Sequence, residues 1–173
     1  IQRNDATKLT FARDVDPTYG AAFDAARIAG VEAIALRCKI TPDEIRVDKS
    51  ERRMELLRNG KVIRTYRILL GDAPVGHKRQ QGDERTPEGR YRISFRNDRS
   101  RFHLSLRISY PNEADRSQAR ARAVDPGGDI MIHGNTPPGY ARDWTDGCIA
   151  LTDRQIEEVW RLVPVGTPIV ISP

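Results

Sequence analysis

The chain has 173 residues, of which 38% are hydrophobic and 31% charged, a composition that fits one soluble domain with a heavily charged surface and room for a small appendage. Its net charge of +5 comes from 29 basic and 24 acidic residues interspersed along the chain, which indicates a solvated surface and argues against a nucleic-acid interface. No stretch approaches the roughly 18 apolar residues of a membrane span, and the start at Ile1 without a recognisable signal peptide points to a trimmed chain whose location the residues leave open.

Residues 1–42 are predicted to form a small helix-and-strand appendage. An Ala-rich run at 19–29 has apolar residues three and four positions apart, which predicts a helix. Residues 31–40 predict a strand that buries Cys38 as a small hydrophobe. Thr41-Pro42 then breaks the pattern and sets the boundary to a second domain at 43–173.

The appendage carries a resemblance of its own. The stretches at 2–6, 16–19 and 30–32 resemble the end of the sugar-fermentation-stimulation protein family, which implies a link to nucleases. Because these residues contain no complete nuclease carboxylate cluster, we interpret the segment as a structural appendage, and nucleic-acid binding remains an alternative.

Alternating apolar and polar residues predict a series of short strands in the second domain, at 45–47, 53–58, 61–70, 91–95, 103–110 and 168–171. Asn59-Gly60 joins the second and third of these and is the strongest short hairpin signal. The intervening charged residues 96–101 are predicted to form a loop. His77 is interpreted as a solvated loop residue and His103 as a surface histidine.

Two helices are expected beside these strands. Residues 112–123 predict a short polar helix that covers one side of the site. Thr152-x-x-Gln155 is a capping box that begins a second helix, which runs to about Val163. Its apolar residues fall on one face and are assigned to the core: Ile156, Val159, Trp160 and Val163. The elements together predict a mainly β, α+β fold with short helices flanking a single cleft.

The candidate site is a histidine and a cysteine held at the ends of two apolar runs. Ile130-Met131-Ile132 leads to His133, thirteen loop residues follow, and Gly147-Cys148 precedes Ile149-Ala150-Leu151. A free thiol is mostly protonated at neutral pH, so a nearby imidazole raises its reactivity as a nucleophile. The glycine allows a sharp turn that aims backbone N–H groups at an oxyanion. The alternative is a buried structural cysteine with an unrelated histidine.

These motifs resemble a known signature. His133-Gly134 and Thr145-x-Gly147-Cys148-Ile149 resemble the L,D-transpeptidase catalytic-domain family, and further family-like stretches occur in order at 70–71, 76–78, 82–91 and 166–169. The similarity covers about residues 44–173. It implies an L,D-transpeptidase-like β-sandwich or barrel that cross-links or trims peptidoglycan stem peptides through a cysteine acyl-enzyme. It also implies no metal or other cofactor, a monomer, and a periplasmic or cell-envelope location.

The resemblance assigns roles to individual residues. Cys148 is expected to be the nucleophile and His133 the general base, with the Gly147 N–H as an oxyanion donor and the Gly134 carbonyl orienting the imidazole. The candidate substrate-binding residues come from the preceding strand end and from the loop: Tyr110, Arg142, Trp144, Thr145 and Asp146. For Tyr110, a half-buried packing role is an equal alternative.

Two positions depart from the usual family pattern. Asp146 replaces a histidine before Gly-Cys, and Ala150 replaces an arginine or asparagine after it. A carboxylate beside the thiol should oppose thiolate formation. The hypothesis therefore stays divided between a transpeptidase and a hydrolase of the same fold, and a catalytically weak wall-binding module is the further alternative.

Overall fold

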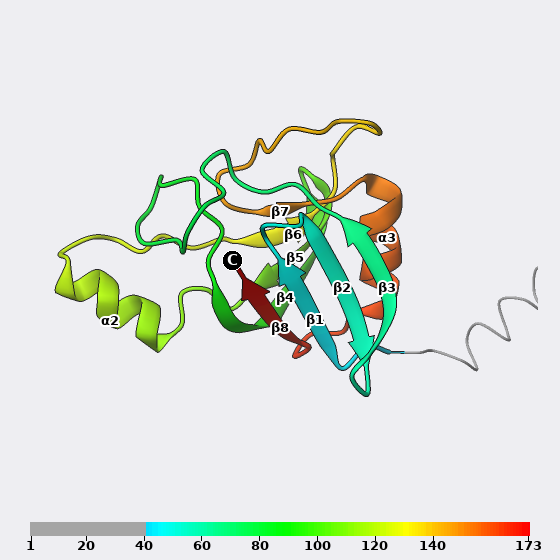
Figure 1. The fold of residues 1–173 in the computed structure, drawn as a ribbon, viewed down its shortest axis with the longest axis horizontal. Coiled ribbons are helices and arrows are strands. Elements are labelled where there is room, and N and C mark those ends of the chain that lie inside the picture. The colour runs from blue at the N-terminus through cyan, green and yellow to red at the C-terminus, as the bar shows by residue number, and fades with distance from the viewer. Residues whose placement is uncertain (1–40) are drawn as a thin grey trace, which may run out of the picture. The chain divides into compact units, whose positions relative to one another are not determined.

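Eight strands and two helices run through residues 41–173, the part of the chain that this computed structural model describes (Figure 1). In chain order they are β1 (Glu44–Asp48), β2 (Arg53–Arg58), β3 (Lys61–Arg67), β4 (Gly89–Ser100), β5 (His103–Ile108), α2 (Glu113–Ala121), β6 (Met131–His133), β7 (Ile149–Ala150), α3 (Asp153–Leu162) and β8 (Pro168–Ser172). The predicted helix at 19–29, the predicted strand at 31–40 and Cys38 lie outside the described residues.

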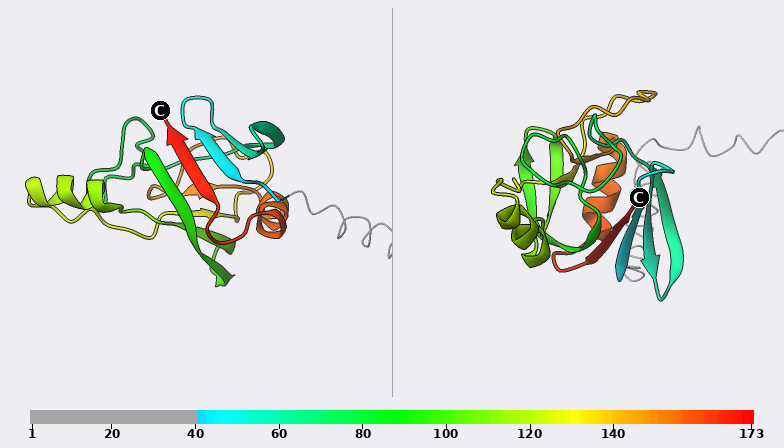
Figure 2. Two further views of the ribbon diagram at one scale, coloured as in Figure 1. Left: turned by 90° about the horizontal axis from the view of Figure 1, so that it is seen from below. Right: turned by 60° about the vertical axis from the view of Figure 1, so that its left-hand side comes forward.

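The strands form one mixed sheet in the order β3-β2-β1-β8-β4-β5-β6-β7. The long strand β4 joins its two halves, because residues 89–92 pair with β8 and residues 93–100 pair with β5. The register shifts between Ile93 and Phe95, and such irregularities increase strand bending and twist. The sheet therefore turns around its own core, and Figure 2 shows α3 beside both halves.

A single hydrophobic core lies inside this curved sheet. It takes alternate residues from β1 and β8, including Ile45, Val47, Ile169 and Ile171, which is the period expected when one face of a strand is buried. Helix α3 contributes Ile156 and Val159, its C-cap residue Val163 adds a third buried side chain, and Trp160 packs at the edge. This confirms the predicted stripe and the sheet-dominated α+β fold.

The local signals for the hairpin and for α3 are confirmed. Asn59 and Gly60 both have positive φ, 51° and 73°, as a type I′ turn requires. At the start of α3, the Gln155 N–H donates to the Thr152 hydroxyl and the Gln155 side chain accepts from the Thr152 N–H, which is the capping box. Two backbone N–H groups without helical partners are thereby satisfied.

Two predictions about the middle of the chain are wrong. Residues 96–100 continue β4, which forms a hairpin with β5 and pairs Asn97 with Ser105. The strand was not predicted because few of its side chains are buried, so the sequence shows no alternation of apolar and polar residues there. The strand predicted at 61–70 ends at Arg67, and Leu69 beyond it makes only an isolated bridge to Ala150.

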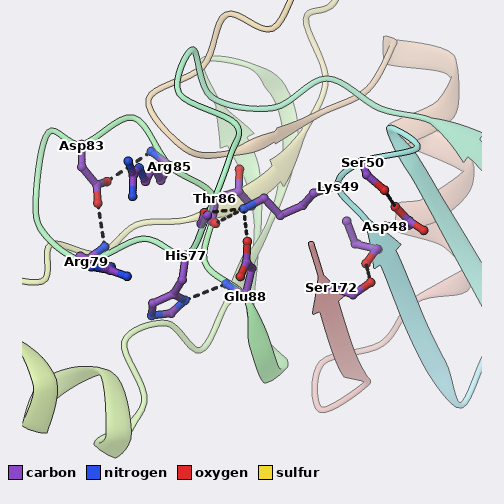
Figure 3. Close-up of polar contacts among 12 residues, drawn as sticks. Asp48, Lys49, Ser50, His77, Arg79, Asp83, Arg85, Thr86, Glu88 and Ser172 are labelled. Atoms are coloured by element: carbon purple, nitrogen blue, oxygen red, sulfur yellow. Dashed lines mark hydrogen bonds and ion pairs between the residues drawn. The ribbon is translucent and has the colours of Figure 1, made fainter.

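A buried lysine in the β1–β2 turn fastens the long loop before β4 (Figure 3). The side chain of Lys49 is 2% exposed, and its ammonium lies 2.8 Å from Glu88 Oε1. It also donates to the carbonyls of Gly76 and Thr86, at 2.6 and 3.1 Å. Burial lowers the pKa of Lys49, an effect that the Glu88 carboxylate opposes. One side chain therefore holds both ends of the loop.

We expect Lys49→Met to destabilise the protein by roughly 2–3 kcal/mol, because the change leaves Glu88 and two carbonyls without their donor. The matched control is Lys61→Met, which removes an exposed lysine of the β2–β3 hairpin and should change stability by less than about 0.5 kcal/mol. Urea denaturation measures the free energy of unfolding of both variants, and their midpoints can be compared when the m-value is unchanged. Equal midpoints for the two variants would contradict the anchoring role.

Candidate active site

Parallel pairing of β6 and β7 brings the predicted histidine and cysteine to one face of the sheet. Ile132 is level with Ile149 and His133 with Ala150, so the same register places Cys148 level with Met131. Met131 and His133 are two residues apart and project from the same face. Cys148 and His133 are therefore diagonal neighbours, a relation that spans roughly 7–8 Å between Cα atoms. Both line one cleft of about 960 Å³.

The imidazole of His133 is buried and fixed in orientation. Its side chain stacks on Phe102, with ring centroids 4.4 Å apart, and meets the edge of Trp144. Nδ1 lies 2.7 Å from the Gly134 carbonyl oxygen. Because a carbonyl only accepts, Nδ1 carries the proton and Nε2 of the neutral ring keeps a lone pair.

Burial keeps this imidazole neutral. It is the largest influence that lowers the pKa of His133, the Gly134 carbonyl opposes it, and the charge of Arg101 adds to the lowering. At neutral pH the ring is therefore a base with one free nitrogen.

Cys148 carries a free thiol. Its Sγ lies 3.6 Å from the Asp129 carbonyl oxygen, to which the thiol donates a hydrogen bond. Burial raises the pKa of Cys148, and a hydrogen bond from the Met131 N–H partly offsets that increase. The Asp146 carboxylate raises the pKa further, in the direction expected from the sequence. The thiol is therefore protonated in the resting protein.

Glycines beside both residues allow the chain to pack closely. Gly147 has φ of +115°, and a Cβ at this position would lie 2.5 Å from the Arg85 carbonyl oxygen. A Cβ on Gly134 would lie 2.6 Å from Asp153 Oδ1 and 2.8 Å from the side chain of Ile156. Larger residues at either position would push the cysteine or the histidine out of place.

The loop between the two residues is tied to the β1–β2 turn and to residue 70. Arg52 Nη2 lies 2.6 Å from Asp143 Oδ2, and the other oxygen of Asp143 accepts from the Leu70 N–H at 2.9 Å. The Leu70 carbonyl in turn accepts from the N–H groups of Trp144 and Thr145. The segment before Cys148 is thus fixed by hydrogen bonds of its backbone N–H groups and by the side-chain contacts of Asp143.

Only some of the remaining predicted site residues line the cleft. Trp144, Thr145 and Asp146 line the cleft, whereas Arg142 and Tyr110 are not among its lining residues. The hydroxyl of Tyr110 donates to the Pro126 carbonyl at 2.9 Å, and the residue is only 3% exposed. Its substrate-binding assignment is therefore replaced by the packing role that the sequence left open.

The Gly147 N–H, the predicted oxyanion donor, has a hydrogen-bond partner in this structure. It donates to the hydroxyl oxygen of Thr145 at 3.2 Å, and the same hydroxyl donates to the Cys148 carbonyl at 2.8 Å. Thr145 therefore closes the turn before Cys148. The oxyanion role of Gly147 stays a prediction, and it requires the N–H to exchange this hydrogen bond for one to the substrate.

The cleft also has walls formed by residues that were not among the predicted site residues. Lys78 comes from the loop before β4, and Arg101 and Phe102 come from the tip of the β4–β5 hairpin. The Gly-x-Lys motif was a signal for Lys78, but the hairpin tip was hidden in the predicted charged loop. Helix α2, predicted to cover one side of the site, contributes no lining residue.

The other two histidines lie outside the cleft. His103 is exposed, with Nε2 2.9 Å from Glu157 Oε1, so it is a surface residue. His77 is half-buried, contrary to its interpretation as a solvated residue. Its Nδ1 accepts from the Glu88 N–H at 2.9 Å, as Figure 3 shows, and its Nε2 lies 3.3 Å from Asp115 Oδ1. It thus connects the loop before β4 to α2.

Within residues 41–173, no group of three or more histidine, cysteine or acidic side chains is arranged to hold a metal ion. Over the same residues, neither helix has the length and apolar character needed to cross a membrane.

Comparisons with known proteins agree on two families. Residues 42–171 match the YkuD family, the L,D-transpeptidase catalytic domain, and residues 1–44 match the sugar fermentation stimulation protein RE domain. The Escherichia coli (strain K12) protein named "Putative L,D-transpeptidase YafK" is 30% identical over 129 residues, which cover 71% of this chain and 48% of YafK. A sugar fermentation stimulation protein homolog of Brucella anthropi is 53% identical over 51 residues, covering 30% of this chain and 21% of that protein.

A solved structure shows the same fold. The helical cell shape determining protein Pgp2 of Campylobacter jejuni superposes with a TM-score of 0.60 at 23% identity, over 75% of this chain and 46% of Pgp2. The chain thus spans about half the length of YafK and of Pgp2. Through residues 42–171, which carry the curved sheet and the cleft with His133 and Cys148, the chain belongs to the L,D-transpeptidase catalytic domain family.

Proposed function

We propose that the cleft catalyses acyl transfer on the L,D peptide bonds of peptidoglycan stem peptides, with Cys148 as nucleophile and His133 as general base. The observation that carries this proposal is the pairing of β6 with β7, which sets Cys148 and His133 on one face of one cleft. Family membership supplies the substrate class.

The protonation states define the first step. Because thiol and imidazole are both neutral at rest, Nε2 of His133 removes the Sγ proton as the sulfur attacks the carbonyl carbon. A C–S bond forms, and the carbonyl oxygen becomes an oxyanion. The Cys148 N–H is the donor proposed for this oxyanion, since the Gly147 N–H is bound to Thr145. The Gly134 carbonyl is proposed to steady the imidazolium through Nδ1–H.

Collapse of the intermediate completes acylation. The C–N bond breaks, the imidazolium gives its proton to the departing amine, and a thioester remains on Cys148. His133 then removes a proton from the second nucleophile, which attacks the thioester carbonyl carbon. The C–S bond breaks, and the Cys148 sulfur takes the proton from the imidazolium. An amine acceptor yields a new cross-link, whereas water yields a shortened stem. Transpeptidase and L,D-hydrolase activity therefore share every step up to the acceptor.

The organisation of the whole chain is part of the proposal. We infer that residues 43–173 are the catalytic domain and that residues 1–42 are a separate appendage, which the two family matches meeting at 42–44 support. We also infer action in the periplasm or cell envelope, where peptidoglycan lies, and a role in cell-wall remodelling and cell shape. Secretion of the native gene product to that compartment tests the location.

Incubation with purified muropeptides followed by mass spectrometry tests the activity. We expect cross-linked or shortened stems from the wild type, at least about 10³-fold less product from Cys148→Ala, and roughly 10²–10⁴-fold less from His133→Gln. Cys38→Ser is the matched control and should keep full activity. Unchanged product with Cys148→Ala would exclude the acyl-enzyme, and a folded wild type that binds muropeptides without converting them would leave a wall-binding module.

The pH dependence of thiol alkylation tests the electrostatics of the site. In a Cys38→Ser background, we expect iodoacetamide to react with Cys148 at a rate that still rises at pH 9, because burial and Asp146 hold its pKa above the ordinary value. Removal of one carboxylate in Asp146→Asn should lower that pKa and speed alkylation at pH 8 by about threefold.

The matched control for alkylation is Asp98→Asn, which changes an exposed carboxylate of the β4–β5 hairpin outside the cleft and should leave the rate unchanged. A rate that levels off below pH 8 in the parent protein, or equal rates in the two variants, would show that the thiol is not held protonated in this way.

A further inference from the structure

We propose that Lys78 binds the free carboxylate of the substrate, at the terminal D-amino acid whose amine leaves during acylation. This inference rests on the proposed function and adds a specificity-determining residue to it.

Lys78 presents a nearly buried cation to the cleft. Its side chain is 3% exposed, yet the residue lines the cleft that contains Cys148. Nζ donates to Asp83 Oδ1 at 2.8 Å and to the Gln80 carbonyl at 3.1 Å. An ammonium has three N–H donors, and among residues 41–173 these are the two acceptors that it contacts. The third donor is available to a ligand.

The paired carboxylate leaves much of this positive charge in place. Asp83 also accepts hydrogen bonds from the N–H groups of Arg79, Gln80 and Arg85, at 2.7, 3.1 and 3.2 Å; Figure 3 shows the Asp83 carboxylate turned toward Arg79 and Arg85. Burial would raise the pKa of Asp83, but these donors together with Lys78 lower it overall. Backbone dipoles therefore balance part of its negative charge, and Lys78 can attract a second carboxylate.

The loop that carries Lys78 is held in place before any substrate arrives. Lys49 fastens the Gly76 and Thr86 carbonyls on either side of it, and the neighbouring His77 is bonded to Glu88. A cation held in this way loses little conformational freedom when it binds a ligand.

The charges around the cleft leave few places for a carboxylate. Four exposed acidic residues line it: Glu84, Asp125, Asp129 and Asp146. The other cation in the lining is Arg101, which is exposed and lies over the Phe102 ring at 4.7 Å. A carboxylate is therefore repelled from the rim and attracted to the wall at Lys78.

Lys78 is also close enough to the nucleophile for this purpose. Its charge acts on the thiol and lowers the pKa of Cys148, against the larger effect of burial. In an L,D peptide with a free terminus, the carboxylate is attached to the same Cα as the departing nitrogen. A carboxylate held at Lys78 thus sets the scissile bond within reach of the sulfur.

Peptide binding to the full chain carrying Cys148→Ala tests this inference without chemistry. The probes are acetyl-L-lysyl-D-alanine and its C-terminal amide, titrated by calorimetry or NMR. We expect the acid to bind roughly tenfold to a hundredfold more tightly than the amide, the range of one charge-assisted hydrogen bond. Adding Lys78→Met should remove that preference by weakening the acid alone.

Two further variants separate charge from structure. Asp83→Asn keeps the ammonium of Lys78 and should retain the preference for the acid. If the Lys78–Asp83 pair were merely structural, Asp83→Asn and Lys78→Met would reduce that preference equally. Arg101→Gln should also retain the preference. Equal affinity of acid and amide, no binding of either, or a preference that disappears with Arg101→Gln and survives Lys78→Met would overturn the assignment.

The outcome is separable from that of the proposed function. Acid preference that depends on Lys78, in a protein whose wild type converts no muropeptide, would support this carboxylate site and reject the acyl transfer. Conversion of acid and amide at equal rates in both the wild type and Lys78→Met would support the acyl transfer and reject the carboxylate site.

Discussion

The site depends on the parallel pairing of two very short strands, β6 and β7. Parallel neighbours need a connection that leaves the sheet and returns, so the residues between them must form a loop that closes on itself. Arg52 and Leu70 hold Asp143 in that loop, and the glycines at 134 and 147 let it pass close to α3 and to the Arg85 carbonyl. Cys148 and His133 lie on one face of one cleft because this return path is fixed.

Burial favours the uncharged form of both the Cys148 thiol and the His133 imidazole. It disfavours the thiolate of Cys148 and the imidazolium of His133, so the resting pair is neutral and differs from a preformed ion pair. In the proposed mechanism, the thiolate forms only as the proton moves to Nε2 during attack. Asp146 favours the same resting state, since its carboxylate repels a thiolate. The departure from the usual family residue is therefore consistent with general-base catalysis.

Local signals in the sequence predicted much of the fold and pointed to His133 and Cys148, which line one cleft in the structure. Asn59-Gly60, the Thr152–Gln155 capping box and the runs around His133 and Cys148 are short patterns whose physics is contained in a few neighbouring residues. The contacts of Tyr110, Gly147 and His77 depend instead on groups that folding brings together, such as the bond between His77 and Glu88, eleven residues apart. The hairpin at 96–105 was missed because few of its side chains are buried.

One turn of four residues connects the support of the fold to the support of the site. Lys49 holds the loop that carries Lys78, and Arg52, three residues later, holds the loop that carries Cys148. Arg52 takes a positive φ of 49° to do so, a backbone conformation that non-glycine residues adopt at some cost. Because both cleft walls are tied to the same β1–β2 turn, a shift of that turn would move Cys148 and the proposed carboxylate site together. The β1–β2 turn thus helps to keep the distance between Cys148 and Lys78 constant.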